Sequence, residues 1–281
     1  MKICHSGGVG LWLIGVTYSV LFQEFPHDQL DAVSEAVSHV YQIPPFDART
    51  KVHRGWGFLE QNVSDTEAQH ICNALAEQGI AALVVANSDL RMPLEPDVMV
   101  GFSPHSEGFT PRLQSPTAVP RSIGWDDIAI VAAGGFKEEV VRRDTADRAP
   151  GAGVQLMGLG ILLMTGMPTK ALFGDKKKKK DKPVKAARFI SFGQIVLNNG
   201  ESLYFDPVHF EFSGLGAKKQ LNTLLNFRGL VAEFARGNLA RTNLGARCLL
   251  DNKSISAANY HGLKDFETEL LWLLNSTVAA K

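Results

Sequence analysis

The sequence predicts an α+β protein, in which a small α/β sandwich precedes a β domain that ends in helices. Helical and β-strand patterns alternate in residues 16–90, as they do in a two-layer sandwich. An Asn-Gly pair separates two apolar runs within residues 189–216, which indicates a β-hairpin. Amphipathic helical patterns follow towards the C-terminus. At 281 residues the chain has room for two domains.

Residues 62–85 predict a helix followed by a buried strand. Ser64 and Glu67 have the spacing of a capping box, in which each side chain accepts a hydrogen bond from the other residue's backbone amide. Gly79 suits the left-handed position that ends a helix, and the aliphatic run 80–85 is typical of a strand covered on both faces. The apolar stripe of the predicted helix consists of Ala68, Ile71, Cys72 and Leu75.

An earlier strand, helix and strand precede this unit. Residues 15–25 are rich in Val, Tyr and Phe and predict the first strand. Residues 27–41 predict a helix that ends before Pro44 and Pro45, and the glycine-flanked run 54–60 predicts an edge strand. The order β-α-β-α-β predicts a sandwich with its helices on one face. The inward residues of the helix are expected to be Leu30, Val33, Val37, Val40 and Tyr41.

The second half of the chain begins with short predicted strands. Six closely spaced prolines after the α/β unit exclude an uninterrupted helix there. Residues 98–103 and 109–113 predict two strands that are joined by a turn. Residues 120–136 give the clearest strand pattern in this half, and we expect the strand to end at Gly134 and Gly135.

A hairpin and two helices complete the predicted elements. Asn199 and Gly200 predict the hairpin turn because both residues tolerate a positive φ. Residues 221–237 and 262–275 predict amphipathic helices. The first is expected to bury Leu221, Leu224, Leu225, Phe227, Val231 and Phe234, and the second Phe266, Leu270, Trp272 and either Leu273 or Leu274.

Several motifs carry a family resemblance. The segment "EAQHICNALAEQGIAALVV" (67–85) resembles the ferredoxin-like modules of cell-wall-binding SPOR domains and the C-terminal domain of the ribosomal stalk protein. The strand "IGWDDIAIV" (123–131), with its hairpins and capping helix, resembles a bacterial pleckstrin-homology-like domain. With "NTLLNFRGLVAEF" (222–234) and "GLKDFETELLWLL" (262–274), these motifs resemble a family of uncharacterised two-domain bacterial proteins over most of residues 16–275. The resemblance implies a ferredoxin-like sandwich followed by a pleckstrin-homology-like domain, and it supplies no catalytic residue.

The domain boundaries are predicted from these elements. Residues 1–15 contain a Gly-Gly-Val-Gly stretch, yet strand-like residues follow where a dinucleotide-binding turn requires a helix. Their apolar core has no small-x-small cleavage site after it, which argues against a signal peptide. The prediction is an N-terminal extension at 1–15, a ferredoxin-like module at 16–90, a linker at 91–97, a pleckstrin-homology-like domain at 98–236 with a flexible insertion at 144–186, and a helical extension at 237–281.

Bulk composition and the reactive side chains argue against several function classes. Lys+Arg and Asp+Glu both number 29, so no global field favours a nucleic-acid partner. Cys4, Cys72 and Cys248 are far apart and form no metal-binding pattern, which favours a reducing cytoplasm. His70 and Cys72 point to different sides of one helix, and His209 is expected to face solvent or a polar contact. No G-x-S-x-G or H-E-x-x-H motif occurs, so the sequence predicts neither an enzyme nor a cofactor.

Two adjacent segments differ from an ordinary core. Residues 153–168 form an apolar run, shorter than the roughly 20 residues of a membrane-spanning helix, and buried packing is its simplest interpretation. Residues 175–188 carry eight basic residues and two aspartates, a local charge of 8 − 2 = +6. Such a run is usually a solvated loop, although an apolar segment with a basic cluster can also bind anionic lipid. The candidate contacts with an anionic surface are Lys176, Lys177, Lys178, Lys179, Lys180 and Lys182.

Together with the resemblance, these observations predict a non-catalytic bacterial binding or scaffold protein of the cytoplasm. It would act through contacts with a protein partner or with a second copy of itself, because such folds present sheet faces and edges that accept partners. The alternative is a peripheral adaptor at the inner membrane that uses residues 153–168 and 176–182. An enzyme of unrecognised type would need a pocket in which two or more titratable groups converge.

Overall fold

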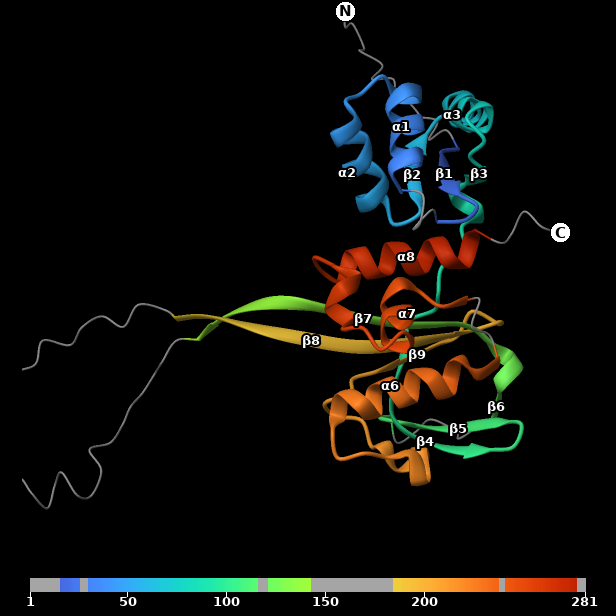
Figure 1. Cartoon of the computed structure of the whole chain (residues 1–281). Coiled ribbons are helices and arrows are strands. Elements are labelled where there is room, and N and C mark those ends of the chain that lie inside the picture. The colour runs from blue at the N-terminus through green and yellow to red at the C-terminus, as the bar shows by residue number, and fades with distance from the viewer. Residues whose placement is uncertain (1–15, 26–29, 116–120, 143–183, 238–240, 277–281) are drawn as a thin grey trace, which may run out of the picture. The chain divides into compact units, whose positions relative to one another are not determined.

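The computed structural model divides the chain into two compact units (Figure 1). One unit consists of residues 1–136 together with 190–281, and the other of residues 137–189. The described part of the second unit consists of strand residues alone. The structure describes residues 16–25, 30–115, 121–142, 184–237 and 241–276.

The described residues mix helices and strands, which confirms the α+β fold class. None of their helices is long and apolar enough to cross a membrane. In chain order the main elements are β1 (Tyr18–Phe22), α1 (Leu30–Tyr41), α2 (Pro45–Gly55), β2 (Phe58–Val63), α3 (Asp65–Glu77), β3 (Ala82–Ala86), β4 (Asp97–His105), β5 (Gly108–Leu113), β6 (Ile123–Gly124), β7 (Ile128–Arg142), β8 (Val184–Leu197), β9 (Ser202–Phe205), α6 (Thr223–Phe234), α7 (Leu244–Leu250) and α8 (Leu263–Asn275). Short 3₁₀ helices η3 (Trp125–Asp127), η4 (Phe212–Lys218) and η7 (Ile255–Ala258) join some of them.

Helix α2 is an element that sequence reasoning missed, as is α7 later in the chain. The pattern of α1 does end before Pro44, but Pro45 is already the first residue of α2. Proline is well suited to the first helical position, because its fixed φ matches the helix and its missing N–H would have no intrahelical partner there. The predicted order β-α-β-α-β is therefore wrong by one helix, and the first 90 residues have the order β-α-α-β-α-β.

The first three strands form an antiparallel sheet in the order β2-β1-β3, with β2 at an edge as predicted. Val20 and Phe22 of β1 pack in a core with residues of α1, α2 and α3. Leu21, between them, belongs to a second core that contains Phe58 of β2 and residues of α8. Both faces of β1 are therefore buried, because the helices α1 to α3 cover one face and α8 contributes to the cover of the other.

The larger sheet has the order β6-β5-β4-β9-β8-β7. Its β8–β9 pair is antiparallel, which confirms the predicted hairpin. Gly200 takes a φ of 86°, whereas Asn199 keeps a negative φ, so only one of the two turn positions uses the left-handed region. This is the pattern of a turn closed by a glycine bulge, in which the glycine supplies the left-handed residue.

Strand β7 does not end at Gly134 and Gly135, and that prediction is wrong. The strand continues to Arg142. A Cβ on Gly134 would lie 2.5 Å from the ring of Phe192 and 2.9 Å from the ring of Phe266. Glycine is needed here because the strand passes close to two aromatic rings, not because the chain turns.

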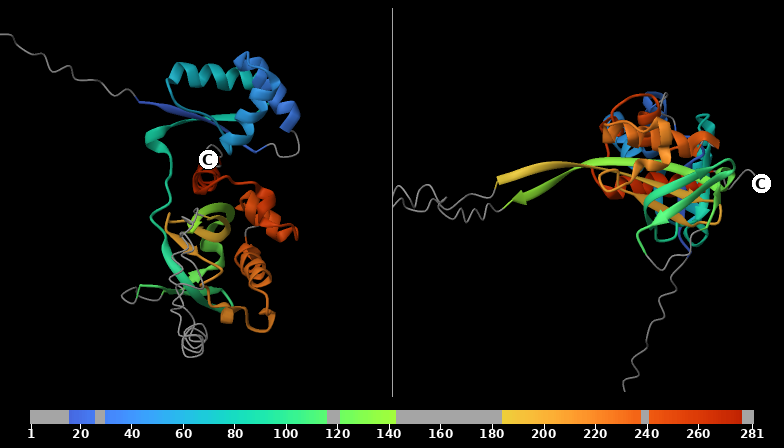
Figure 2. Two further views of the ribbon diagram at one scale, coloured as in Figure 1. Left: turned by 90° about the vertical axis from the view of Figure 1, so that its left-hand side faces the viewer. Right: turned by 90° about the horizontal axis from the view of Figure 1, so that it is seen from below.

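The larger sheet curves around helix α6, with β4 and β5 on one side of the helix and β7 to β9 on another (Figures 1 and 2). The ring of Phe234 at the end of α6 contacts three rings from different strands. The centroid distances are 5.3 Å to Phe102 of β4, 5.0 Å to Phe109 of β5 and 5.8 Å to Phe205 of β9. Aromatic packing of this kind fixes the curvature, since each ring fills space between the helix and a different strand.

Helix α7 belongs to the same core as α6. Its residues Ala246 and Leu249 pack in the cluster that holds β4, β5 and α6, although the sequence-based division assigned residues 237–281 to a separate extension. Just before α7, Asn243 is fully buried and its amide pairs with both the N–H and the C=O of Ala133 in β7, each at 2.9 Å. The Asn243 side chain thus hydrogen-bonds to the backbone of β7 as a residue of a neighbouring strand would.

A buried polar network extends from Asn243 to α8. The amide of Asn243 donates to the Tyr260 hydroxyl at 2.8 Å, and that hydroxyl donates to the carboxylate of Glu269. Glu269 also accepts from the amide of Leu244 at 2.8 Å. Burial raises the pKa of the Glu269 carboxyl despite these hydrogen bonds, and it raises the pKa of the Tyr260 hydroxyl well above its ordinary value.

Candidate functional site

The predicted lysine tract lies outside the described residues, as does most of the segment around it. Lys176 to Lys180 and Lys182 fall within residues 143–183, and so does the apolar run 153–168. The candidate contact with an anionic surface therefore stays a prediction.

Both cysteines of the described chain have a thiol whose pKa is raised. Cys248 is buried, and the Cys72 thiol donates a weak hydrogen bond to the carbonyl of Ala82 at a sulfur–oxygen distance of 3.2 Å. Desolvation raises the pKa of both thiols, which lowers the fraction of reactive thiolate. His209 is exposed and its ring contacts the Asp206 carboxylate at 2.6 Å, which agrees with the expected polar contact.

The largest departure from the expected core lies at the start of α6. Phe227, Val231 and Phe234 are buried as predicted. Leu221, Leu224 and Leu225 are not, and their exposed fractions are 108%, 47% and 38%. We call these three residues the leucine tip. Their spacing of three and four residues places them along one side of the chain where it enters the helix.

Two asparagine side chains fix the backbone of the leucine tip. Asn222 is the N-cap of α6, and its side-chain oxygen accepts from the amides of Leu224 and Leu225 at 2.8 and 3.2 Å. Asn226 is buried and pairs with both the N–H and the C=O of Gln220, at 2.6 and 2.7 Å. The chain on both sides of Leu221 is therefore held in place by hydrogen bonds, although the Leu221 side chain itself makes no buried contact.

Exposed basic side chains lie before and after α6. Lys218 and Arg236 both pair with Glu233, and the two basic side chains are 67% and 62% exposed whereas Glu233 is 12% exposed. Lys219 is also exposed and helps to lower the pKa of the Glu211 carboxyl, whose main partner is Arg112. Lys218 and Lys219 come just before the leucine tip in the chain, whereas Arg236 follows α6 at its other end.

A signal for the leucine tip was present in the sequence. Asn222 is a preferred N-cap residue, and an N-cap at that position places Leu221 outside the helix. Helical periodicity instead placed Leu224 one turn before Phe227 on the buried side. Periodicity failed here because it assumes that the covering sheet extends along the whole helix.

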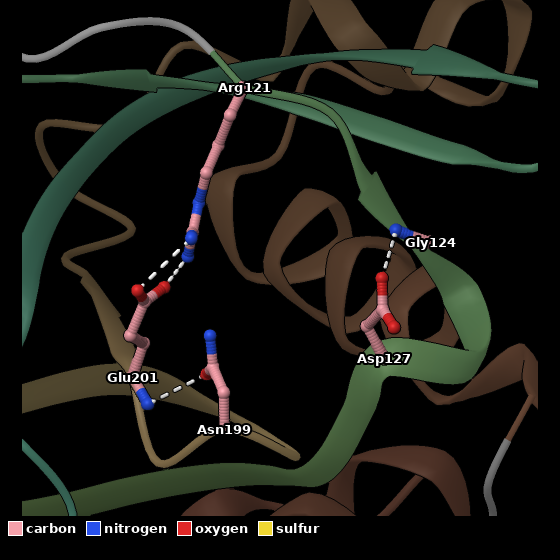
Figure 3. A network of polar contacts seen from close by, with 5 residues as sticks. All are labelled: Arg121, Gly124, Asp127, Asn199 and Glu201. Atoms are coloured by element: carbon pink, nitrogen blue, oxygen red, sulfur yellow. Dashed lines mark hydrogen bonds and ion pairs between the residues drawn. The ribbon is translucent and has the colours of Figure 1, made fainter.

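A polar pocket lies beside the β8–β9 turn (Figure 3). It has a volume of about 210 Å³ and is lined by residues 121–123, Asp127 and residues 197–199. Arg121 pairs with Glu201, and Asp127 accepts from the amide of Gly124 at 2.9 Å. These charged groups therefore already have partners. The pair of Arg121 and Glu201 holds the segment around β6 against the β8–β9 hairpin. Asp127 thus stabilises the turn between β6 and β7.

One contact near this pocket has the composition of a nucleophile and a base. The Ser122 hydroxyl lies 2.5 Å from Nε2 of His105. Catalysis by such a pair also requires a group that orients the histidine and donors that stabilise an oxyanion. In the described ranges of the chain, no carboxylate hydrogen-bonds to the His105 ring. The contact is exposed.

A comparison of the chain with protein-family models, curated proteins and solved structures finds no match.

Proposed function

We propose that this chain is a non-catalytic binding module that attaches to a partner protein through the leucine tip. The supporting observation is the exposure of Leu221, Leu224 and Leu225 on a turn that hydrogen bonds hold rigid. Clustered apolar side chains on a soluble surface commonly mark interaction sites, whereas single exposed ones do not.

The rigidity of the turn favours this interpretation over a simple packing defect. Binding costs conformational entropy, and a surface that is already ordered loses less of it. Asn226 holds Gln220 and Asn222 holds Leu224 and Leu225, so the backbone of the tip is ordered before any partner arrives. Three leucines on a fixed turn can insert into a preformed apolar groove as anchors.

The surrounding charge indicates the chemistry of the partner. Lys218 and Lys219 are exposed and come just before the leucine tip in the chain. Complementary charge steers association and fixes register. The partner surface is therefore an apolar groove with an acidic rim.

Photo-crosslinking tests this proposal. A photoreactive amino acid replaces Leu221 in the full chain, which is expressed in its native host, and the crosslinked peptide is identified by mass spectrometry. We expect one protein to crosslink at this position through a segment with apolar and acidic residues. In titrations of the two purified proteins, Leu224→Ser combined with Leu225→Ser then weakens binding by about tenfold or more, which corresponds to about 1.4 kcal/mol.

Leu94 provides the matched control, because its side chain is 57% exposed and lies outside the tip. A photoreactive residue at position 94 is expected not to capture the same protein, and Leu94→Ser is expected to leave the affinity unchanged. Equal affinity for the tip variant and the unmodified chain would exclude the tip as the binding surface.

Anionic lipid is the second candidate partner. Exposed Lys218 and Lys219 beside the exposed leucines favour it, because apolar insertion and basic charge act together at membranes. The lysine tract 176–182 and the apolar run 153–168 would add to such binding. Vesicles with and without phosphatidylserine separate the two candidates. Salt-sensitive co-sedimentation that needs both the leucine tip and the tract supports the peripheral adaptor, at the inner membrane of a bacterial cell.

We also propose the finer fold assignment. The order β-α-α-β-α-β with three antiparallel strands supports a compact module of the ferredoxin-like or ribosomal-stalk type in residues 16–90. The sheet that curves around α6 supports a pleckstrin-homology-like second part. Both kinds of module present surfaces to partners and need no catalytic residue.

A further inference from the structure

A second pocket lies where α2 ends and α8 begins, and none of its residues takes part in the leucine tip. Its volume is about 290 Å³. Both elements belong to the larger compact unit. The lining residues are His53, Arg54, Trp56, Asn259, His261 and Asp265.

Two residues of this pocket have an unusual backbone conformation. Trp56 has a φ of 47° and Asn259 a φ of 57°, both in the left-handed region. Asparagine adopts this region fairly often, but a bulky residue such as tryptophan rarely does. Packing holds Trp56 in this conformation. The centroid of its ring lies 4.7 Å from that of Tyr260, and only 4% of the residue is exposed. Strained residues of this kind gather at ligand sites.

The indole N–H of Trp56 is buried and has no acceptor among the described residues. Nearly all buried N–H groups in native proteins have an acceptor, either in the protein or in a bound molecule. Trp56 forms part of the pocket wall, but its N–H is closed off from solvent. An oxygen atom bound in the pocket would supply the missing acceptor once a small movement of the ring opens the N–H to it.

The electrostatics of the pocket favour an anion. Arg54 carries a permanent positive charge, and the rings of His53 and His261 can add donors. Helix α8 begins at the pocket with Gly262 as its N-cap, so no side chain caps the first amides of this 13-residue helix. Uncapped amides and the helix dipole both attract negative charge. Asp265 is the opposing charge, and its Oδ2 is engaged by the amide of His261 at 2.9 Å.

We propose that this pocket binds a small oxyanion, namely phosphate or the phosphate group of a small molecule. The Arg54 guanidinium can bind two oxygens of such an anion at once, and the indole N–H of Trp56 would gain an acceptor. A volume of about 290 Å³ accommodates a phosphate group with a small substituent. The proposal is independent of the leucine tip, because the two sites share no residue.

Nuclear magnetic resonance of the full chain tests the proposal, with inorganic phosphate as the probe in a buffer of constant chloride and ionic strength. We expect a saturable shift of the Trp56 indole N–H resonance, which Trp56→Phe identifies by its loss. The indole N–H of Trp272 already donates to the carbonyl of Phe22, so its resonance is expected not to shift. Arg54→Gln, an exposed substitution, should weaken phosphate binding by about tenfold or more.

Arg49→Gln is the matched control. Arg49 lies on the same helix as Arg54, and its substitution changes the net charge by the same amount. Its partner, however, is Asp31, which does not line the pocket. The Arg49→Gln variant is expected to bind phosphate like the unmodified chain. Asp265→Asn keeps an acceptor for the His261 amide and is expected to tighten binding. If glycerol phosphate binds more tightly than inorganic phosphate, the ligand of the pocket is the phosphate group of a small molecule. The reverse order of affinities identifies the free phosphate ion as the ligand. A Trp56 signal that does not move with either probe, or equal losses in Arg49→Gln and Arg54→Gln, would overturn the assignment.

Discussion

The indole N–H of Trp272 in α8 donates a 2.7 Å hydrogen bond to the carbonyl oxygen of Phe22 at the end of β1, 250 residues away in sequence. The Trp272 ring also packs edge-on against Phe25, with centroids 5.8 Å apart. Leu21 of the first sheet and Phe192 of the second sheet both belong to the core that contains α8. A helix near the C-terminus therefore completes the packing of a sheet that is formed by the first 90 residues.

The first prediction concerns Gly57, which lies against Trp272. Its φ is 97°, and a Cβ on it would lie 2.1 Å from Cγ of the Trp272 ring. Gly57→Ala is expected to reduce the free energy of unfolding by about 2 kcal/mol or more, because it combines a disfavoured φ with overpacking. Urea denaturation monitored by circular dichroism measures the change.

Gly55 is the control for this substitution, two residues earlier in α2. A Cβ at Gly55 meets no atom within 4 Å. Gly55→Ala should leave the stability unchanged or raise it by up to about 1 kcal/mol, since alanine favours the helix. Equal losses in the two variants would show that Gly57 does not owe its role to Trp272.

The second prediction concerns Asn243. Its side chain is fully buried and makes contacts of 2.8 to 2.9 Å with Ala133, Ala246 and Tyr260. Asn243→Ala leaves several buried groups without partners, so we expect a loss of about 3 kcal/mol or more, at about 1–3 kcal/mol for each orphaned group. Asn222→Ala removes an exposed helix cap and should cost only about 1 kcal/mol. Similar losses in thermal or urea unfolding would contradict a bridging role for Asn243.

The third prediction concerns the pH dependence of stability. Burial raises the pKa of the Glu269 carboxyl in the folded chain. A carboxyl of this kind contributes stability that is fully present below its unfolded-state pKa and is lost as the pH rises through the folded-state pKa. The free energy of unfolding of the unmodified chain, measured relative to that of Glu269→Gln, is therefore expected to fall as the pH rises from acidic to neutral.

Urea titrations at several pH values test this dependence. Tyr260→Phe removes a hydrogen bond that lowers the pKa of Glu269, so the loss of stability with rising pH should become larger in that variant. A stability difference between the unmodified chain and Glu269→Gln that stays constant with pH would contradict the buried carboxyl.

The fourth prediction contrasts the two sides of α6. Leu224 is 47% exposed, whereas Leu230 is fully buried in the core. Leu224→Ser should change the free energy of unfolding by less than about 0.5 kcal/mol, as is usual for exposed positions. Leu230→Ala should cost about 2–5 kcal/mol through the cavity that it leaves. A large loss in Leu224→Ser would mean that the tip is part of the folded core and not a binding surface.

The sequence by itself determined the elements whose signals are local. Ser64 accepts a hydrogen bond from the Glu67 amide as the N-cap of α3, and the Asn199-Gly200 hairpin forms between β8 and β9. Such caps and turns depend on a few adjacent residues, so the residue types at fixed spacing are sufficient to predict them. The buried stripe of α8 was also predictable, since Phe266, Leu270, Trp272 and Leu273 recur at helical spacing.

The tertiary structure alone decided which surfaces are covered. Gly134 looked like the end of a strand, yet two aromatic rings from distant segments require its missing side chain. Leu221 and Leu224 looked like core, yet both side chains are exposed in the described part of the chain. Periodicity shows what a segment could bury, whereas exposure depends on contacts between residues far apart in the chain. For the same reason the leucine tip and the Trp56 pocket, the two candidate binding sites, emerge only in the folded protein.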